Sequence, residues 1–274
     1  MAELDDRGQL TIDGASLEYR MIGPRPHAAP TIVMLHEGLG SVSTWGEFPD
    51  QVAARSKAGV FVYSRAGYGQ SSPVRLPRPL DYNQREAIHV LPKLLDAIGF
   101  RRGLLLGHSD GASIAAYYAG SVQDHRVRGL VLMAPHFFTE PEGLAEIRNA
   151  KQAYETTDLR ARLARHHADV DVAFRGWNDA WLDPGFPEAF EMTEALAYIR
   201  VPILIIQGED DRYGTVKQIR VAEEECYCPV ETLLLPACGH APHRDKPAET
   251  LEGVGAFVDR ILRVHGEAAQ MQAA

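Results

Sequence analysis

The sequence has 274 residues, of which 45% are hydrophobic and 24% charged, and its formal net charge is −9. This length and composition fit one large globular domain, or one domain with an insertion. The acidic balance argues against a nucleic-acid partner, which needs clustered lysine and arginine, and no apolar run reaches membrane-spanning length.

The N-terminus and the cysteines indicate the compartment. Residues 1–6 are acidic and no apolar stretch follows them, so we expect no signal peptide. Cys226, Cys228 and Cys238 are odd in number and form no disulfide framework, which favours a reducing compartment. The Cys-x-Cys spacing is a poor match to zinc sites. We therefore expect a cytoplasmic protein that uses neither a metal nor a cofactor.

The first part of the chain predicts a hairpin followed by two strands. Residues 9–12 and 16–21 flank Asp13-Gly14, which is a hairpin turn signal. Residues 31–35 are apolar on both faces, as in the buried central strand of a covered sheet. Residues 60–63 are the next strand.

Two helices are expected around these strands. Thr44 and Glu47 have the spacing of a capping box at the start of a short helix. Asp81 can cap a longer helix. Apolar residues follow it at helical spacing: Ile88, Leu91, Leu95 and Ile98.

A nucleophile elbow is predicted at Ser109. An apolar strand beginning at Leu104 ends in Gly-His-Ser-Asp-Gly at 107–111, and a helix-like run of small residues follows over 112–119. Glycines on either side of the serine let strand and helix approach and let the turn adopt strained dihedrals. The pentapeptide alone is weak evidence, and its place between a strand and a helix makes Ser109 a candidate nucleophile.

The remaining chain predicts an α/β fold with a helical insertion. Strands at 130–133, 201–206 and 231–235 continue a mostly parallel, eight-stranded sheet flanked by helices. Between them, residues 136–199 contain aromatic clusters and no strand-like run. We expect residues 1–135 and 200–266 to form the core, 136–199 a helical cap over the carboxyl edge of the sheet, and 267–274 a flexible tail.

An acid and a base follow the last two strands. Residues 208–211 read Gly-Glu-Asp-Asp, and Gly239-His240 follows the last strand. Serine, then acid, then histidine is the order of a catalytic triad in one class of α/β enzymes. Among these acids Asp211, Asp210 and Glu209 are all candidates, and His243 is the alternative base.

These motifs resemble those of the α/β-hydrolase superfamily over nearly the whole chain. The matching segments are 36–38, 67–71, 107–111, 208–211 and 239–240. The chain is similar to bacterial hydrolases that carry His-Glu-Gly-Leu-Gly, and at Asp110 to valacyclovir-hydrolase-like esterases. The resemblance implies that Ser109 attacks an acyl carbon, that His240 is the base and that Asp211 orients it. It also implies an oxyanion hole made by the N–H groups of Asp110 and Gly38, with Glu37 as the alternative to Gly38.

Two acids stand where an oxyanion would form. Position 37 is glutamate where the superfamily commonly has glycine, and Asp110 follows the nucleophile. Two like charges about 5 Å apart interact by roughly 3 kcal/mol at an effective dielectric near 20. These carboxylates must therefore turn away, pair with a cation such as Arg65, take up a proton, or hold a cationic group of the substrate.

The sequence thus predicts a serine hydrolase that acts on a small ester, lactone or thioester. Glu37, Asp110, His136, Trp177 and Trp181 are candidate substrate-binding residues, although aromatic residues at helical spacing more often form a core. A C–C bond hydrolase, a cofactor-free lyase or oxygenase, and a small-molecule receptor are alternatives on the same fold. An aspartate-nucleophile dehalogenase or epoxide hydrolase is disfavoured by Ser109. We expect a monomer or homodimer whose partner is a small acyl substrate, with no nucleic acid and no membrane.

Overall fold

A computed structural model describes residues 4–272 of the backbone and the side chains of residues 4–262. Its centre is an eight-stranded sheet in the order β1-β2-β4-β3-β5-β6-β7-β8, which confirms the predicted sheet. The β1–β2 and β2–β4 pairs are antiparallel and all other pairs are parallel. The strands are β1 (Arg7–Ile12), β2 (Ala15–Ile22), β3 (Thr31–Leu35), β4 (Gly59–Tyr63), β5 (Gly103–His108), β6 (Val127–Met133), β7 (Ile203–Gly208) and β8 (Val230–Leu235).

Alternate residues of the central strands feed two separate cores. In β3, Ile32 and Met34 join one cluster, while Val33 and Leu35 join the other, because successive side chains of a strand point to opposite faces. Helices α1 (Phe48–Ser56) and α12 (Pro247–Gln272) cover the first face. The second face is covered by α3 (Leu91–Ala97), α4 (Asp110–Ser121) and α10 (Val216–Glu225).

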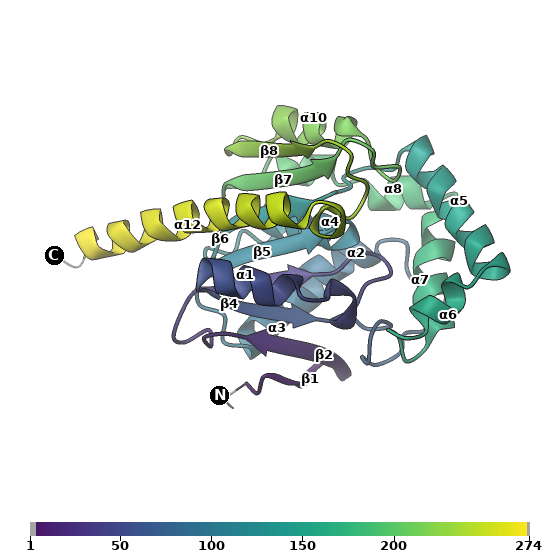
Figure 1. Cartoon of the computed structure of the whole chain (residues 1–274), viewed down its shortest axis with the longest axis horizontal. Coiled ribbons are helices and arrows are strands. Elements are labelled where there is room, and N and C mark those ends of the chain that lie inside the picture. Colours follow the sequence, from purple (N-terminus) through teal and green to yellow (C-terminus); the bar gives the residue numbers. More distant parts are fainter. Residues whose placement is uncertain (1–3, 273–274) are drawn as a thin grey trace.

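Helices also fill the segment between β6 and β7. They are α5 (Pro141–Thr156), α6 (Leu159–Leu163), α7 (Val170–Trp181), α8 (Phe186–Phe190) and α9 (Thr193–Leu196). Figure 1 shows α5, α6 and α7 gathered beyond one end of the sheet. They have a hydrophobic cluster of their own, which includes Phe174, Trp181 and Phe186. We call this segment the cap.

The strand order places the ends of β3 and β5 side by side. From β3 the chain moves outward to β4, and it then returns to the other side of β3 as β5. Ligands of open α/β sheets bind at such a switch point, beyond the carboxyl ends of the strands. The loop after β3 and the turn after β5 therefore meet where a site is expected.

The predicted capping box at Thr44 is wrong. The Thr44 hydroxyl bonds the backbone of Ser41, so no capping box forms; Thr44 lies in the short 3₁₀ helix η1 (Ser43–Trp45), and α1 begins at Phe48. At the C-terminus, α12 continues to Gln272, and the flexibility of residues 267–274 stays a prediction. Residues 273–274 of that segment lie outside the described part. Among the described residues, no helix combines the length and hydropathy needed to cross a bilayer.

His243 is buried in an aromatic layer beside the sheet. It lies on α11 (Pro242–Asp245), and its ring centroid is 5.1 Å from that of Trp45 and 5.4 Å from that of Phe48. Neither ring nitrogen has a hydrogen-bond partner among the described residues. Burial lowers the pKa of His243 to about 3, so the ring is neutral in the folded protein.

We expect His243 to destabilise the fold in acid. An unfolded histidine titrates at about 6.5, so below this pH the unfolded state binds a proton that the folded state refuses until about pH 3. The free energy of unfolding therefore decreases as the pH falls through this window. Between pH 7 and pH 5 the single group accounts for about 2 kcal/mol. In urea unfolding, His243→Phe is expected to lose about that much less stability than the wild type over this interval.

The exposed histidine His27 provides the matched control, and His27→Gln should keep the wild-type pH dependence. Equal losses in His243→Phe and the wild type would mean that the folded protein accepts a proton at His243.

Candidate active site

Ser109 occupies a strained turn between β5 and α4. Its backbone has φ 52° and ψ −120°, in the left-handed half of the map that non-glycine residues rarely adopt. A Cβ at Gly111 would overlap the carbonyl of Leu35, and one at Gly107 would overlap the backbone of Gly111. The two glycines therefore permit the close approach that projects Ser109 from the sheet edge.

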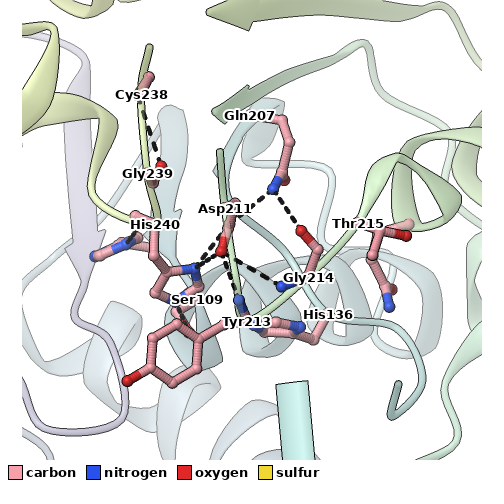
Figure 2. A network of polar contacts seen from close by, with 12 residues as sticks. Ser109, His136, Gln207, Asp211, Tyr213, Gly214, Thr215, Cys238, Gly239 and His240 are labelled. Atoms are coloured by element: carbon pink, nitrogen blue, oxygen red, sulfur yellow. Dashed lines mark hydrogen bonds and ion pairs between the residues drawn. The ribbon is translucent and has the colours of Figure 1, made fainter. Parts of the chain in front are cut away.

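Ser109, His240 and Asp211 form a continuous hydrogen-bonded line. Ser109 Oγ lies 2.9 Å from His240 Nε2, and His240 Nδ1 lies 2.8 Å from Asp211 Oδ2. In Figure 2 the His240 ring, from the loop after β8, lies between Ser109 and Asp211, which follow β5 and β7. Asp211 as acceptor places the ring proton on Nδ1, so Nε2 is free to accept the Ser109 proton.

Asp211 is positioned by its own chain. Its carboxylate accepts hydrogen bonds from Gln207 Nε2 at 2.7 Å and from the Tyr213 N–H at 2.8 Å. Burial alone would raise the pKa of Asp211, but the interactions with His240 and the Tyr213 N–H hold it below its usual value. Asp211 is therefore ionised at neutral pH. Asp210 and Glu209, the other acids considered, are exposed.

The loop over residues 36–40 is held from below by Arg65. This fully buried guanidinium donates from Nη1 to the His36 carbonyl and from Nη2 to the Glu37 carbonyl. Burial, together with the Arg65 charge, keeps the pKa of His36 well below its usual value, so the ring is neutral. The His36 ring accepts from the Arg65 N–H and donates from Nδ1 to the Glu37 carbonyl.

This bonding directs the Gly38 N–H. In a trans peptide the carbonyl of one residue and the N–H of the next point in opposite directions. The Glu37 carbonyl faces Arg65 and His36, so the Gly38 N–H faces away from them. Gly38 lines the same cavity as Ser109. The N–H of Asp110, the first residue of α4, also has no acceptor within its helix.

The Asp110 carboxylate lies behind the site. It is fully buried, does not line the cavity, and accepts a hydrogen bond from the Tyr82 hydroxyl, which in turn accepts one from Trp181 Nε1. Burial raises the pKa of Asp110, and Arg65 offsets part of the effect. This position does not support the expectation that Asp110 contacts the substrate through its side chain, because Tyr82 already occupies it.

The Glu37 carboxylate lies on the cavity wall between the side chains of His108 and Arg244. Glu37 Oε2 is 3.6 Å from His108 Nδ1, and Glu37 Oε1 is 3.8 Å from Arg244 Nη2. Burial alone would raise the pKa of Glu37, but His108 and Arg244 hold it well below its usual value. Glu37 is therefore a paired carboxylate.

A cavity of about 190 Å³ opens above Ser109. Of the residues predicted to bind substrate, His136, Trp177, Trp181 and Glu37 line it. Burial, with the nearby His240 ring, lowers the pKa of His136 to about 3, so His136 is a neutral ring at the cavity wall. Sequence reasoning missed further lining residues: Leu39, His108, Ile147, Tyr213, Ala241 and Arg244.

Most of these missed residues had a usable signal. Leu39, His108, Tyr213 and Arg244 stand within a few positions of a predicted site residue, at the carboxyl ends of sheet strands. Ile147 is on cap helix α5, for which the sequence offered no register against the core.

Comparison with known proteins places this geometry in a family. A model described as "Alpha/beta hydrolase family" matches residues 32–252. A proline iminopeptidase of Lactobacillus helveticus is 23% identical over 290 aligned positions, covering 92% of this chain and 97% of that protein. A proline iminopeptidase of Lactobacillus delbrueckii subsp. bulgaricus is 27% identical, covering 70% of this chain and 77% of that protein.

Solved structures share the fold. The enol-lactonase from Burkholderia xenovorans LB400 superimposes with a TM-score of 0.70 at 22% identity, covering 92% of this chain and all of that one (100%). The esterase RhEst1 from Rhodococcus sp. ECU1013 gives a TM-score of 0.70 at 22% identity, covering 94% and 100%. The family model covers most of the chain, and the chain therefore belongs to the alpha/beta hydrolase family.

Proposed function

We propose that this hydrolase is a serine enzyme that cleaves a small carboxylic ester, lactone or thioester through an acyl-enzyme on Ser109. The observation that carries the proposal is the unbroken line from Ser109 Oγ through His240 to Asp211, at 2.9 Å and 2.8 Å. Such a line is the requirement for nucleophilic catalysis by an otherwise weak hydroxyl nucleophile.

In the proposed mechanism His240 moves the proton. Nε2 takes the Ser109 proton as Oγ attacks the acyl carbon, and the imidazolium that forms is stabilised by Asp211. His240 then gives the proton to the leaving group, which departs to leave the acyl-enzyme. A water molecule deprotonated by His240 attacks the ester carbon of the acyl-enzyme, and Ser109 regains its proton.

Backbone N–H groups stabilise the negative charge of each tetrahedral intermediate in this proposal. The donors are the N–H of Asp110, at the positive end of α4, and the N–H of Gly38. The Arg65 contacts support this assignment of Gly38, because they turn the preceding carbonyl away from the cavity.

The size and lining of the cavity support a small acyl group. About 190 Å³ is below the roughly 300–1,000 Å³ of pockets for drug-sized ligands. Ile147, Trp177 and Trp181 give the cavity an apolar wall on the cap side. Short aliphatic or compact cyclic acyl groups match this space.

The charges on the wall favour a neutral acyl group over one with an ammonium. Glu37 is the one acid among the described residues that line the cavity, and it already faces His108 and Arg244. The iminopeptidase relatives make an aminopeptidase the second candidate. An enzyme of that kind must bind a free amino group, and here Glu37 would have to leave its contacts with His108 and Arg244 to do so.

We expect Ser109→Ala to abolish hydrolysis of p-nitrophenyl acetate, with kcat/KM at least about 10³-fold below the wild type, because no other hydroxyl bonds His240 Nε2 among the described residues. Stopped reactions analysed by mass spectrometry should show an added acetyl mass on the wild type and none on the variant. Undiminished turnover by Ser109→Ala would overturn the proposal. A wild type that cleaves no ester would favour the C–C hydrolase, lyase, oxygenase or receptor alternatives.

We expect Asp211→Asn to lower kcat by roughly 10³- to 10⁴-fold while the fold is retained, because the amide no longer fixes the Nδ1–H tautomer of His240. The exposed acid next to Asp211 gives a matched control. The kcat of Asp210→Asn should remain within about 3-fold of the wild type, since a change in an exposed surface side chain has little effect. Steady-state kinetics of the two variants decide the assignment. A larger loss in Asp210→Asn would make Asp210 the acid.

We expect the enzyme to prefer a neutral p-nitrophenyl ester over the matched α-amino ester, because Glu37 is paired and the Asp110 carboxylate is buried against Tyr82. The measurement is kcat/KM for both esters at one pH with equal leaving groups. A strong preference for the amino ester would point to the aminopeptidase candidate and to Glu37 as the group that binds the ammonium.

A further inference from the structure

The residue before the nucleophile contacts the main chain of the proposed base. His108 ends β5, is buried, and its Nε2 lies 2.6 Å from the carbonyl oxygen of His240. A carbonyl can only accept a hydrogen bond, so His108 Nε2 carries a proton. The ring centroids of His108 and His240 are 5.2 Å apart, so the two rings are neighbours.

The other nitrogen of His108 faces a carboxylate. His108 Nδ1 is 3.6 Å from Glu37 Oε2, within ion-pair distance, and has no hydrogen-bond partner among residues 4–262. With Nε2–H fixed, a neutral His108 would direct a lone pair at a carboxylate oxygen, and two acceptors would face each other in a buried site. That arrangement is unfavourable unless one proton lies between them.

We propose that Glu37 and a His108 protonated on both ring nitrogens are a positioning ion pair that holds the His240 main chain in place for reaction at Ser109. The inference rests on the proposed function, because it assigns both residues to the geometry of the proposed base. Glu37 belongs to the 36–40 loop and His240 to the loop after β8. The pair therefore connects the segment that carries Gly38 with the segment that carries His240.

His108 holds the His240 loop at the carbonyl of the proposed base itself. Other hydrogen bonds of this loop run from the Gly239 N–H to Asp245 Oδ2 and from the Asp210 N–H to the Cys238 carbonyl, both at 2.9 Å. The His240 side chain is 20% exposed, yet it must keep 2.9 Å to Ser109 and 2.8 Å to Asp211. His108 fixes the loop from its buried side, and a shift of about 1 Å in such a group costs on the order of 10²-fold in rate.

The location of the proton follows from the surrounding charges. Against its own burial, the pKa of the Glu37 carboxyl is held well below its usual value by His108 and Arg244, which leaves the carboxylate as the charged partner. In the proposed pair the second proton of His108 is on Nδ1, because this nitrogen faces the Glu37 carboxylate at 3.6 Å. The other titratable or charged groups that face the pair are Arg244, His36, His136, His167, His240 and His243.

Ring-nitrogen NMR of ¹⁵N-histidine-labelled protein at pH 7 tests the proton directly and requires no turnover. We expect both nitrogens of His108 to be protonated in the wild type and one in Glu37→Gln, with the signal assigned by its loss in His108→Asn. If His108 of the wild type had only one protonated nitrogen, the proposed ion pair with Glu37 would be overturned.

Kinetics on a neutral p-nitrophenyl ester test the positioning role. We expect Glu37→Ala to lower kcat by about 10- to 100-fold with KM within about 3-fold of the wild type, because a misplaced base affects reaction more than binding. Glu37→Gln should recover most of kcat, since its amide can donate to His108 Nδ1 while Nε2–H remains on the His240 carbonyl. The matched control is Glu47→Ala, which removes an exposed acid near Glu37 in the sequence and should leave kcat unchanged.

An unchanged kcat in Glu37→Ala would exclude the positioning role even if the NMR result held. Equal losses in Glu37→Ala and Glu37→Gln, with unaltered melting temperatures, would also exclude it and would favour direct contact of the carboxylate with substrate. Failure of the proposed function is seen separately, as a wild type that neither turns over the ester nor is acylated at Ser109.

Discussion

The buried guanidinium of Arg65 organises the site from beneath. A fully desolvated cation is costly unless it is hydrogen-bonded. Here Nη1 and Nη2 bond the carbonyls of His36 and Glu37, while Nε has no partner among the described residues. Those two bonds, with the neutral His36 ring, fix which face of the 36–40 loop presents N–H groups to the cavity. Arg65 also offsets the charge of Asp110, which lies buried against Tyr82 without an ion-pair contact. Arg65 thus determines which way the peptide groups of the loop point, and it also stabilises the buried Asp110 carboxylate beside the nucleophile.

The two acids that the sequence places at the reaction centre are accommodated in different ways. Asp110 turns away behind the elbow, and Glu37 stays on the wall beside His108 and Arg244. Neither leaves an uncompensated negative charge next to the proposed oxyanion, where repulsion of a few kcal/mol would slow acyl transfer. The carboxylate on the cavity wall is therefore paired, and Ile147, Trp177 and Trp181 make the cap side of the cavity apolar.

The sequence predicted what depends on local pattern. Apolar strands ending in glycine-rich loops located the sheet and the candidate Ser109. Chain order indicated an acid among residues 209–211 and the candidate base His240, because sheet topology brings strand ends together, and the family resemblance pointed to Asp211 among the acids. Side-chain partners from distant segments, such as Tyr82 against Asp110, leave no local pattern. Helical phase also failed at Ile88, which is 38% exposed because a π-helical turn over Glu86–Val90 shifts the periodicity. The capping box at Thr44 was wrong because a tighter turn at Ser41 takes the hydroxyl.

Trp177 of α7 and Gly38 of the 36–40 loop restrict each other. A Cβ at position 38 would overlap the indole Nε1 of Trp177, so the cap rests directly on the backbone that is proposed to bind the oxyanion. Cap exchange is an obvious route to new substrate range in this family, but here a foreign cap would have to supply a residue that fits over bare backbone at position 38. The cap therefore cannot be exchanged independently of the 36–40 loop. Gly38 and Trp177 should be changed together when the enzyme is redesigned.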